Sequence, residues 1–576
     1  MPGGLLNLVA LGNQNVYLNG NPTKTFFKTT YSKYTNFGMQ KFRIDFEGSR
    51  NLKLTEDSVF NFKIPRYADL LMDTYIAVNL PNIWSPIFPP VSNETDANDR
   101  NKWAPYEFKW IKNLGTEMIK EISITAGGQI LQKYSGSYLK NLVERDYTNT
   151  HKELFNKMTG NIPELYDPGN SGARVNAYPN AFYDTSEFGP VPSIESRTLY
   201  IPINTWFTHS SKTAFPLIAM QYNELHINIT FRPVQDLFVI RDVTDVFNDF
   251  PNIKPNFNVN EFQMYRFLQK PPNVSLEDQF YINKSVNWIA DIHLISTYGF
   301  LSDEESRLFA RRTHKYLIKE VHEYKFENVT GNRKIKVDTN GMVSSWMFYL
   351  QRSDINLRNE WSNYSNWPYN YLPNDIQLAP KDGYELPNIG AIGDNNIGPN
   401  TNFDGGSSST NTSENSNNNT NSNTTNKFFI TGSFRNENRK NILIDVGLLF
   451  DGNYRENVFS SDIYRYIEKY AKSKTNSDDG LYCYNFCLNT SPYEYQPSGA
   501  INMSKFKNIE LELSTYVPPY DSEAQFYTIC DEAGNIIGVN QPSWRLFDYN
   551  FDLYIQEERY NIVYFSNGNC GLMYSR

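Results

Sequence analysis

Alternation of apolar and polar residues with a period of two is the feature that most constrains the fold of this chain. It is clearest over residues 225–231, where every second side chain is apolar. Successive side chains of a β-strand point to opposite faces of its sheet, so this pattern indicates a half-buried strand. The same alternation recurs at residues 122–124, 335–337, 509–513 and 551–555. Strands are therefore predicted along the whole chain.

Turn residues divide these strands into short pieces. Pro-Pro pairs stand at 89–90, 271–272 and 518–519, among many Asn and Gly. Helical patterns are few: a capping box over residues 302–305, and apolar residues on one helical face at 139–143 and 154–158. They are too sparse for a fold of alternating strands and helices. We therefore expect an all-β architecture of packed sheets.

Composition narrows the class of protein further. Hydrophobic residues make up 40% and aromatic residues 15% of the 576 residues, which is enough to form a large core. The net charge of -9 provides no positive field for phosphates, so we expect no direct binding of nucleic acid. The apolar run at residues 5–11 is too short to span a membrane and has no basic region before it. These features favour a soluble chain made and kept in a cytosol.

The sequence contains four cysteines, too few for a disulfide scaffold. Cys483 and Cys487 fall in a predicted strand, where about 3.3 Å per residue places them about 13 Å apart. Disulfide bonding requires Cα atoms within about 7 Å, so this pair is predicted to be free.

The pattern of strands predicts two β domains. Residues 232–272 contain several prolines and no sustained alternation, which indicates the boundary. We predict an arm at 1–25, a first domain at 26–245, a connector at 246–280 and a second domain at 281–576. Residues 395–427 are predicted to form a surface loop, because the segment is rich in Asn, Ser and Thr. Its glycosylation sequons at Asn411, Asn418 and Asn423 are possible glycan sites, although such a tract generates sequons by chance.

Catalytic and metal-binding motifs are missing from the sequence. It contains no G-x-S-x-G elbow, phosphate loop, G-x-G-x-x-G or H-E-x-x-H, and no two of its six histidines are four residues apart. The acids at 303–305 are interpreted as first-turn residues of a helix, not as the paired carboxylates of a glycosidase. We therefore expect no enzymatic activity, no metal and no cofactor.

The aromatic segment 359–372, NEWSNYSNWPYNYL, allows two interpretations. Its Trp and Tyr rings could stack on sugars, which would suit a β-sandwich lectin or adhesin. They could equally pack within a long loop or at a subunit interface, where such residues concentrate, and this second interpretation is favoured.

Five segments closely resemble the major capsid proteins of nucleocytoplasmic large DNA viruses, in particular the mimivirus-like and phycodnavirus-like branches. They occur in the family's order and span nearly the whole chain: GGLLNLVALGNQNVYLNGNPTKTFFKTTYSKYTNF at 3–37, IKNLGTEMIKEISITAGGQILQKYSGSYL at 111–139, LYIPINTWFTHSSKTAFPLIAMQYNEL at 199–225, YGFLSDEESRLFARRTHKYLI at 298–318 and YQPSGAINMSKF at 495–506. The most distinctive matching positions are Gly127, Gly128, Gln129, Gln496, Pro497, Ser498 and Gly499.

The resemblance implies two consecutive eight-stranded antiparallel jelly rolls, with a few short helices and long surface loops. It also implies homotrimeric, pseudo-hexagonal capsomers that tile an icosahedral shell, assembled in the host cytoplasm. Minor capsid and penton proteins would be partners. Loops 85–105, 160–197 and 374–427 would project outward.

The same resemblance places the amino-terminal arm inside the shell, near minor capsid proteins and an internal lipid membrane. Glycines and Pro22 suit an extended arm that becomes ordered on assembly. Its anchoring residues would be Leu5, Leu6, Leu8 and Val9. The alternative is an ordinary buried first strand.

Overall fold

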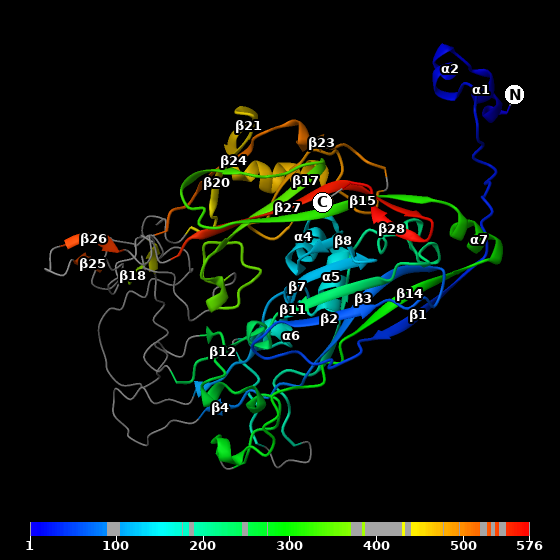
Figure 1. Cartoon of the computed structure of the whole chain (residues 1–576). Coiled ribbons are helices and arrows are strands. Elements are labelled where there is room, and N and C mark those ends of the chain that lie inside the picture. Colours follow the sequence, from blue (N-terminus) through cyan, green and yellow to red (C-terminus); the bar gives the residue numbers. More distant parts are fainter. Residues whose placement is uncertain are drawn as a thin grey trace, which may run out of the picture.

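A computed structural model describes residues 2–88, 104–175, 177–183, 189–244, 252–273, 275–369, 383–385, 429–431, 439–475, 477–494, 496–518, 527–530, 536–540 and 549–574. Within these residues the main strands form two sandwiches, and a helix lies between them (Figure 1).

The first sandwich consists of two antiparallel sheets. One sheet has the order β1 (Phe37–Asp45), β14 (His293–Leu301), β3 (Leu70–Leu80) and β10 (Phe215–Pro216), and β9 (Arg197–Pro202) also pairs with β3. The facing sheet has the order β2 (Ser58–Lys63), β11 (Leu225–Phe231), β7 (Ile119–Ala126) and β8 (Gln129–Tyr134).

The second sandwich repeats this arrangement. Its first sheet has the order β15 (His314–Phe326), β27 (Phe551–Ser566), β17 (Met342–Arg352) and β22 (Tyr482–Asn485), with β23 (Ile501–Asn502) on β17 and β28 (Asn569–Leu572) on β27. The facing sheet has the order β16 (Asn332–Lys336), β24 (Ile509–Thr515), β20 (Leu443–Phe450) and β21 (Asn453–Ser460). Two four-strand paths in each sandwich give the eight strands of a jelly roll, as predicted, and we call the sandwiches the first and second roll.

The remaining elements are short and lie in the connections between these strands. The short strands are β4 (Ile87–Phe88), β5 (Ala104–Pro105), β6 (Lys109–Trp110), β12 (Phe238–Arg241), β13 (Asn252–Ile253), β18 (Gly383–Glu385), β19 (Phe429–Thr431), β25 (Tyr527–Cys530) and β26 (Ile536–Asn540). The helices are α1 (Gly3–Val9), α2 (Asn13–Asn19), α3 (Leu114–Glu117), α4 (Gly136–Asp146), α5 (Asn149–Thr159), α6 (Pro163–Tyr166), α7 (Asp303–Arg311), the π-helical turn η11 (Ile463–Ile467) and α8 (Glu468–Lys472).

Strand β14 corrects the predicted division of the chain. The sequence boundary assigns it to the second domain, but it pairs with both β1 and β3 inside the first roll. The predicted connector 246–280 therefore lies in a loop of the first roll, between β11 and β14. The chain passes to the second roll through α7. A proline-rich stretch without alternation has the same composition in a long loop as in a linker, so the sequence does not separate the two.

The burial of side chains explains why these strands form. Along β11, buried and half-exposed residues alternate without exception, as the period of two requires. The buried set includes Phe231, whose ring meets the ring of Phe60 on β2 edge-to-face at 5.5 Å. A separate set of apolar side chains fills the second roll, among them Trp346, Leu511 and Phe551. Each roll thus has its own core.

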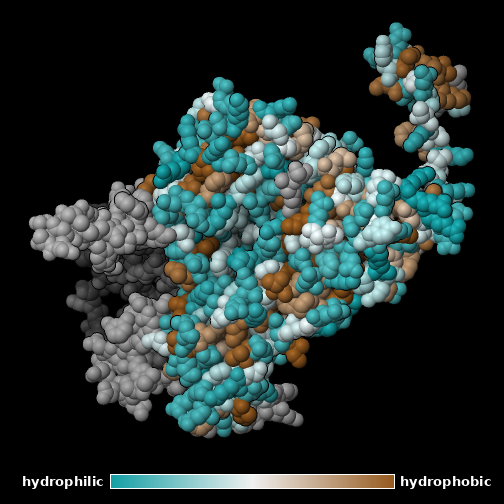
Figure 2. Space-filling model, viewed as in Figure 1, coloured by the Kyte–Doolittle hydropathy of each residue, from teal (hydrophilic) through white to brown (hydrophobic). Residues whose placement is uncertain are grey.

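The amino-terminal segment differs from the predicted extended arm. Residues 3–9 and 13–19 are helical, and the chain from residue 20 to β1 is largely extended. Leu5, Leu6, Leu8 and Val9 are 45–69% exposed, so the alternative of a buried first strand is wrong. Figures 1 and 2 show the two helices away from the body of the molecule, with hydrophobic residues on their surface.

Several predicted features lie outside the described residues. They include the whole of the tract 395–427, with Asn411, Asn418 and Asn423. Part of each of the loops 85–105 and 160–197 also lies outside the described residues.

Candidate functional site at the interface between the two rolls

Helix α4 lies between the two rolls and touches both. Its N-terminus is capped by Ser135, whose Oγ accepts a hydrogen bond from the Tyr138 amide at 3.2 Å. Nine of its eleven residues are buried, and they include apolar, polar and charged side chains, in contrast to the single buried stripe of an ordinary surface helix. Burial on all sides is typical of a helix enclosed between two bodies.

The sheet of the second roll that faces α4 is buried on both sides. Along β17, Trp346 and Phe348 belong to the core of the second roll, whereas Met347 and Tyr349 belong to the core that includes the first roll. Because adjacent strand residues point to opposite faces, one strand joins the two cores. The two rolls are therefore held together by apolar packing as well as by polar contacts.

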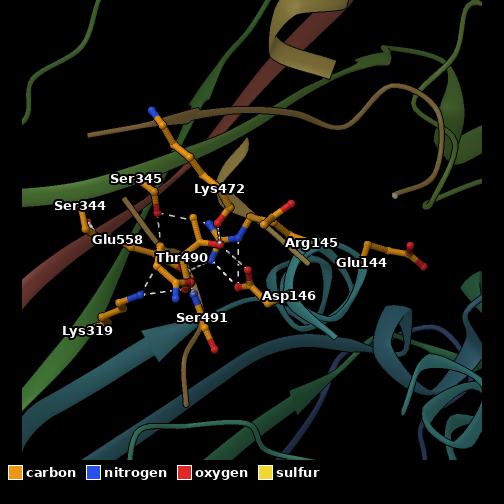
Figure 3. Close-up of polar contacts among 12 residues, drawn as sticks. Glu144, Arg145, Asp146, Lys319, Ser344, Ser345, Lys472, Thr490, Ser491 and Glu558 are labelled. Atoms are coloured by element: carbon orange, nitrogen blue, oxygen red, sulfur yellow. Dashed lines mark hydrogen bonds and ion pairs between the residues drawn. The ribbon is translucent and has the colours of Figure 1, made fainter. Parts of the chain in front are cut away.

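Arg145, at the end of α4, makes the central polar contact of this interface (Figure 3). Its Nη2 lies 2.8 Å from Oε1 of Glu558 on β27 and 2.7 Å from Oδ2 of Asp146. Its Nη1 donates to Oγ of Ser345 at 3.2 Å, and that hydroxyl donates to Oε2 of Glu558 at 2.7 Å. The three charged side chains are at most 1% exposed. Every charge in this group has a partner from the other roll or from its own helix.

Burial and charge act on these carboxyl groups in opposite directions. Burial raises the pKa of a carboxyl group, but the Arg145 guanidinium and the Lys319 ammonium lower the pKa of Glu558 to about 2. At Asp146, burial outweighs the effect of Arg145 and raises the pKa above its ordinary value. Since Glu558 is the better stabilised anion, the pair that joins the two rolls is charged at neutral pH.

A loop of the second roll completes the network. Thr490 donates from Oγ1 to Oδ1 of Asp146 at 2.6 Å, and its carbonyl oxygen accepts from Nζ of Lys319 at 2.9 Å. The loop is held in turn by Ser498, whose Oγ accepts from the Asn489 amide at 3.0 Å and donates to the Asn489 carbonyl at 2.8 Å. Ser498, predicted as a family-motif residue, therefore supports the loop that contacts Asp146.

The other motif residues nearby have backbone roles. Gly499 has a φ of +132°, and a Cβ there would lie 3.2 Å from the Phe486 carbonyl oxygen, so this position favours glycine. Gln496 and Pro497 are exposed.

The glycine turn at 127–128 lies at a second contact between the rolls. Gly127 and Gly128 have φ of +56° and +85°, which join β7 to β8 in a tight hairpin. A Cβ on Gly127 would lie 2.6 Å from the side chain of Asn223, whose amide donates to the Cys570 carbonyl oxygen at 3.5 Å. The side chain of Gln129 lies beside Gly571 of β28. These motif residues therefore fix a tight turn against the carboxy-terminal hairpin.

Further polar contacts surround α4. Asn141 donates to Oε1 of Gln556 at 2.9 Å and accepts from the hydroxyl of Tyr364 at 3.1 Å. Glu117, on α3, is 1% exposed, and its Oε1 has no hydrogen-bond partner. Burial raises the pKa of Glu117, and nearby Arg232 and Lys140 only partly oppose the shift.

The aromatic segment 359–372 packs into the molecule over its described part, residues 359–369. Trp361 donates from Nε1 to the Asp236 carbonyl oxygen at 2.9 Å, and Arg232 lies 4.1 Å above its ring. Tyr364 stacks on Tyr349 with ring centroids 4.1 Å apart. The rings join the two rolls. This supports the interpretation that the segment packs within the molecule, and not the interpretation that it is a sugar-binding platform.

Within the described residues, features of other kinds of site are few. No group of three or more His, Cys, Asp or Glu lies close enough to hold a metal ion, and no helix is long and apolar enough to cross a membrane. An open groove of about 390 Å³ lies on the outer face of β16 and β24. Glu512 in this groove is engaged by Lys334 at 3.5 Å and by the Tyr454 hydroxyl at 2.8 Å. Cys483 and Cys487 are free, as predicted, and Cys570 is free as well.

Two family models match two successive parts of the chain, and β14 lies between the matched ranges. The model described as the major capsid protein N-terminus matches residues 25–269, and the model described as the large eukaryotic DNA virus major capsid protein matches residues 305–571. The chain belongs to the major capsid protein family of large eukaryotic DNA viruses. Its resemblance to that family in sequence is thereby confirmed.

Relatives and solved structures agree with this family. The chain is 24% identical to the major capsid proteins of Chrysochromulina ericina virus and of Phaeocystis pouchetii virus, with both chains covered over their full length. It is 28% identical to capsid protein 1 of Acanthamoeba polyphaga mimivirus over 56% of this chain, and the match spans only 44% of that relative.

Among solved structures, VP54 of PBCV-1 matches with a TM-score of 0.57 and 17% identity, over 96% of this chain and 100% of that one. The Faustovirus major capsid protein matches with a TM-score of 0.59 and 12% identity, over 96% and 94% of the two chains. These likenesses confirm the double jelly-roll fold predicted from the sequence.

Sequence reasoning did not identify the residues at the centre of the interface. Arg145 and Glu558 were not among the predicted site residues. A signal was present in FDLYIQEERYNIVYF, residues 551–565, where three consecutive charged residues interrupt an otherwise alternating strand. A strand that carries Glu557, Glu558 and Arg559 in its middle requires partners for these charges on both faces. The partner on one face is Arg145.

Proposed function

We propose that this capsid protein forms the shell as a homotrimer, in which three chains contribute six jelly rolls to a pseudo-hexagonal capsomer. The observation that carries the proposal is the repeat of one strand order in two rolls that a buried ion pair joins. Two similar rigid blocks per chain give three chains a nearly six-fold outline. A ring of identical contacts then closes after three copies.

Such capsomers would tile the flat faces of an icosahedral shell and meet other copies of themselves in a lattice. Minor capsid and penton proteins would complete the shell, and assembly would take place in the host cytoplasm. The loops 85–105, 160–197 and 374–427 would project outward. The protein would act as a structural component without catalysis, cofactor or direct contact with nucleic acid.

Native mass spectrometry together with negative-stain electron microscopy tests the trimer. We expect a species of three times the 66.8 kDa chain mass at micromolar concentration, with a hexagonal outline. A protein that remains monomeric under these conditions would contradict the proposal.

The amino-terminal arm would act in assembly, facing the inside of the shell near minor capsid proteins and an internal membrane. Its apolar residues Leu5, Leu6, Leu8 and Val9 are exposed, and none of the residues 2–36 is buried in the single chain. Deletion of residues 2–24 should therefore leave the melting temperature unchanged and reduce the yield of closed shells. A large loss of thermal stability would show that the arm belongs to the folded body.

A further inference from the structure

The correspondence between the two rolls includes a helix as well as the strands. In each roll this helix follows the same strand of the shared order. In the first roll, β8 leads directly into α4 through Ser135 and Tyr138. In the second roll, β21 leads directly into η11 and α8 through Ser461 and Tyr464, with the same Ser-x-x-Tyr spacing. Both tyrosines are buried, at 4% and 2% exposure. The two helices therefore occupy corresponding places in their rolls.

Only one of these helices is covered within the chain. The middle of α4 is enclosed against the second roll, and Lys140 and Asn141 are 2% and 0% exposed. The corresponding helix of the second roll exposes apolar and aromatic side chains instead. Tyr466, Ile467 and Tyr470 are 50%, 58% and 93% exposed. We call these three residues, together with the exposed side chains of β21, the free helix face.

The strand that leads into this helix is uncovered as well. Strand β21 is the outer strand of its sheet, and its side chains Tyr454, Val458 and Phe459 are 39–49% exposed. Its counterpart β8 is also an outer strand, but Leu131, Gln132 and Tyr134 are buried, and its turn lies beside β28. An unpaired outer strand flanked by exposed aromatic residues is typical of a surface that another chain covers.

The corresponding sheets of the two rolls also differ in how far their side chains are exposed. The sheet of β15, β27 and β17 receives α4, and Met347 and Tyr349 on that face are 0% and 3% exposed. Within the described residues, the corresponding sheet of the first roll, with β1, β14 and β3, leaves side chains of its outward face exposed on β1 and on the neighbouring β9. Met39 on β1 and Tyr200 on β9 are 60% and 41% exposed. We call the outward face of this sheet, with Met39, Lys41 and Tyr200, the free sheet face.

We propose that the free helix face of one copy packs on the free sheet face of a second copy. This contact reproduces between chains the contact that α4 makes with the second roll within a chain. It rests on the proposed trimer and specifies which surfaces form it. In Figure 1, β21 and β1 lie far apart on the molecule, so one chain cannot bring its own two faces together.

The chemistry of the two faces suits this contact. Three tyrosine or isoleucine side chains on the helix would be removed from water against Met39 and Tyr200, which gives the apolar and aromatic composition of stable subunit interfaces. Lys41 is exposed on the sheet face and would lie among tyrosine rings, where a cation is attracted to the aromatic face. Because the two faces differ, the contact is heterologous and each copy uses both of them, as a closed ring requires.

Two variants of the full chain test the proposal. The helix variant carries Ile467→Asp and Tyr470→Asp, and the sheet variant carries Met39→Asp and Tyr200→Asp. The matched control is Val59→Asp, an equally exposed apolar side chain (63%) on the outer face of β2. All five positions are exposed, so circular dichroism should show an unchanged fold. We expect each double variant to raise the apparent dissociation constant of the trimer about a hundredfold, and the control to leave it unchanged.

Mixing the two variants identifies the pairing of the faces. The sheet variant retains an intact helix face and the helix variant retains an intact sheet face, so a mixture can form one good contact per pair. We expect 1:1 heterodimers in native mass spectra of the mixture and none from either variant alone. If the wild type forms trimers and the helix variant forms them equally well, this inference is wrong, but the proposed trimer is not contradicted. A mixture that stays monomeric would also overturn it, whereas a monomeric wild-type protein would contradict the proposed function itself.

Discussion

Arg145 and Glu558 are 413 residues apart in the sequence and form an ion pair of 2.8 Å in which neither side chain is exposed by more than 1%. One residue ends a helix of the first roll and the other lies in the middle of a strand of the second. Because buried charges are costly unless they are paired, the position of each fixes that of the other. The ion pair therefore specifies how the two rolls are aligned.

Replacement of Arg145 by methionine should destabilise the chain strongly. Met retains much of the apolar volume, but Glu558 and Asp146 lose their shared cation while they remain buried. Removal of one partner of a buried pair typically costs about 3–5 kcal/mol in the free energy of unfolding. Guanidinium unfolding followed by fluorescence measures the change. Lys63→Met, which removes an exposed pair with Glu224, is the control and should leave the unfolding midpoint unchanged; equal effects of the two substitutions would refute the role assigned to Arg145.

The low pKa of Glu558 predicts an acid-dependent part of the stability. The folded-state pKa of about 2 lies below the ordinary value of 4.5, so folding favours the charged form. This contribution is fully present above about pH 4.5 and is lost as the pH falls towards about 2. For a shift of this size it amounts to about 3 kcal/mol.

Comparison of wild type with Glu558→Gln isolates this contribution. We expect the difference in the free energy of unfolding between them to be largest at neutral pH and to shrink steadily between pH 5 and pH 2. Denaturant titrations at several pH values measure it. A difference that does not depend on pH would mean that Glu558 titrates normally in the folded protein.

The hairpin turn between β7 and β8 predicts different tolerances for two glycines. Gly127→Ala adds a Cβ at positive φ and at 2.6 Å from the Asn223 side chain, so it should destabilise the protein by about 1–2 kcal/mol. Gly4→Ala is the matched control, because Gly4 lies in α1 and has no atom within 4 Å of the added Cβ. Melting temperatures of the two variants compare them. An unchanged melting temperature for Gly127→Ala would mean that the turn relaxes freely.

Ser498 and Thr490 should act as a coupled pair through the loop that Ser498 holds. Ser498→Ala removes two hydrogen bonds to Asn489, and Thr490→Val removes the hydrogen bond to Asp146. Each substitution should cost about 1–2 kcal/mol. Once Ser498 no longer holds the loop, the hydrogen bond of Thr490 contributes less to stability. The double variant should therefore lose less free energy of unfolding than the two single variants together. Strict additivity in a double-mutant cycle would show that the loop is held independently of Ser498.

Local patterns in the sequence predicted the elements well. The alternation at 225–231 and 509–513 corresponds to β11 and β24, and α7 begins directly after Ser302, where the capping box was predicted, although Ser302 makes no side-chain cap hydrogen bond. The apolar face at residues 139–143 lies in α4. These features depend on neighbours in the sequence, which is why the pattern alone identifies them. The resemblance to capsid proteins supplied the double jelly roll.

Contacts between residues that are distant in the sequence could not be predicted from local patterns. The membership of β14 in the first roll depends on its pairing with β1 and β3, which its own sequence does not encode. The partner of Glu558 is likewise set by packing between the rolls. The arm was expected to be extended because of its glycines, and residues 3–9 and 13–19 are nevertheless helical although they contain several weak helix formers.

The central position of β14 affects the order in which the protein can fold during synthesis. Strands β1 and β3 leave the ribosome early, but they flank β14 and have no hydrogen bonds to each other along the path of the sheet. Their facing edges remain unpaired until residues 293–301 have emerged, long after the strands of the opposite sheet. Unpaired edges of nascent chains are sites of aggregation. Newly made chains of this protein therefore pass through a period in which association with one another competes with closure of the first sheet.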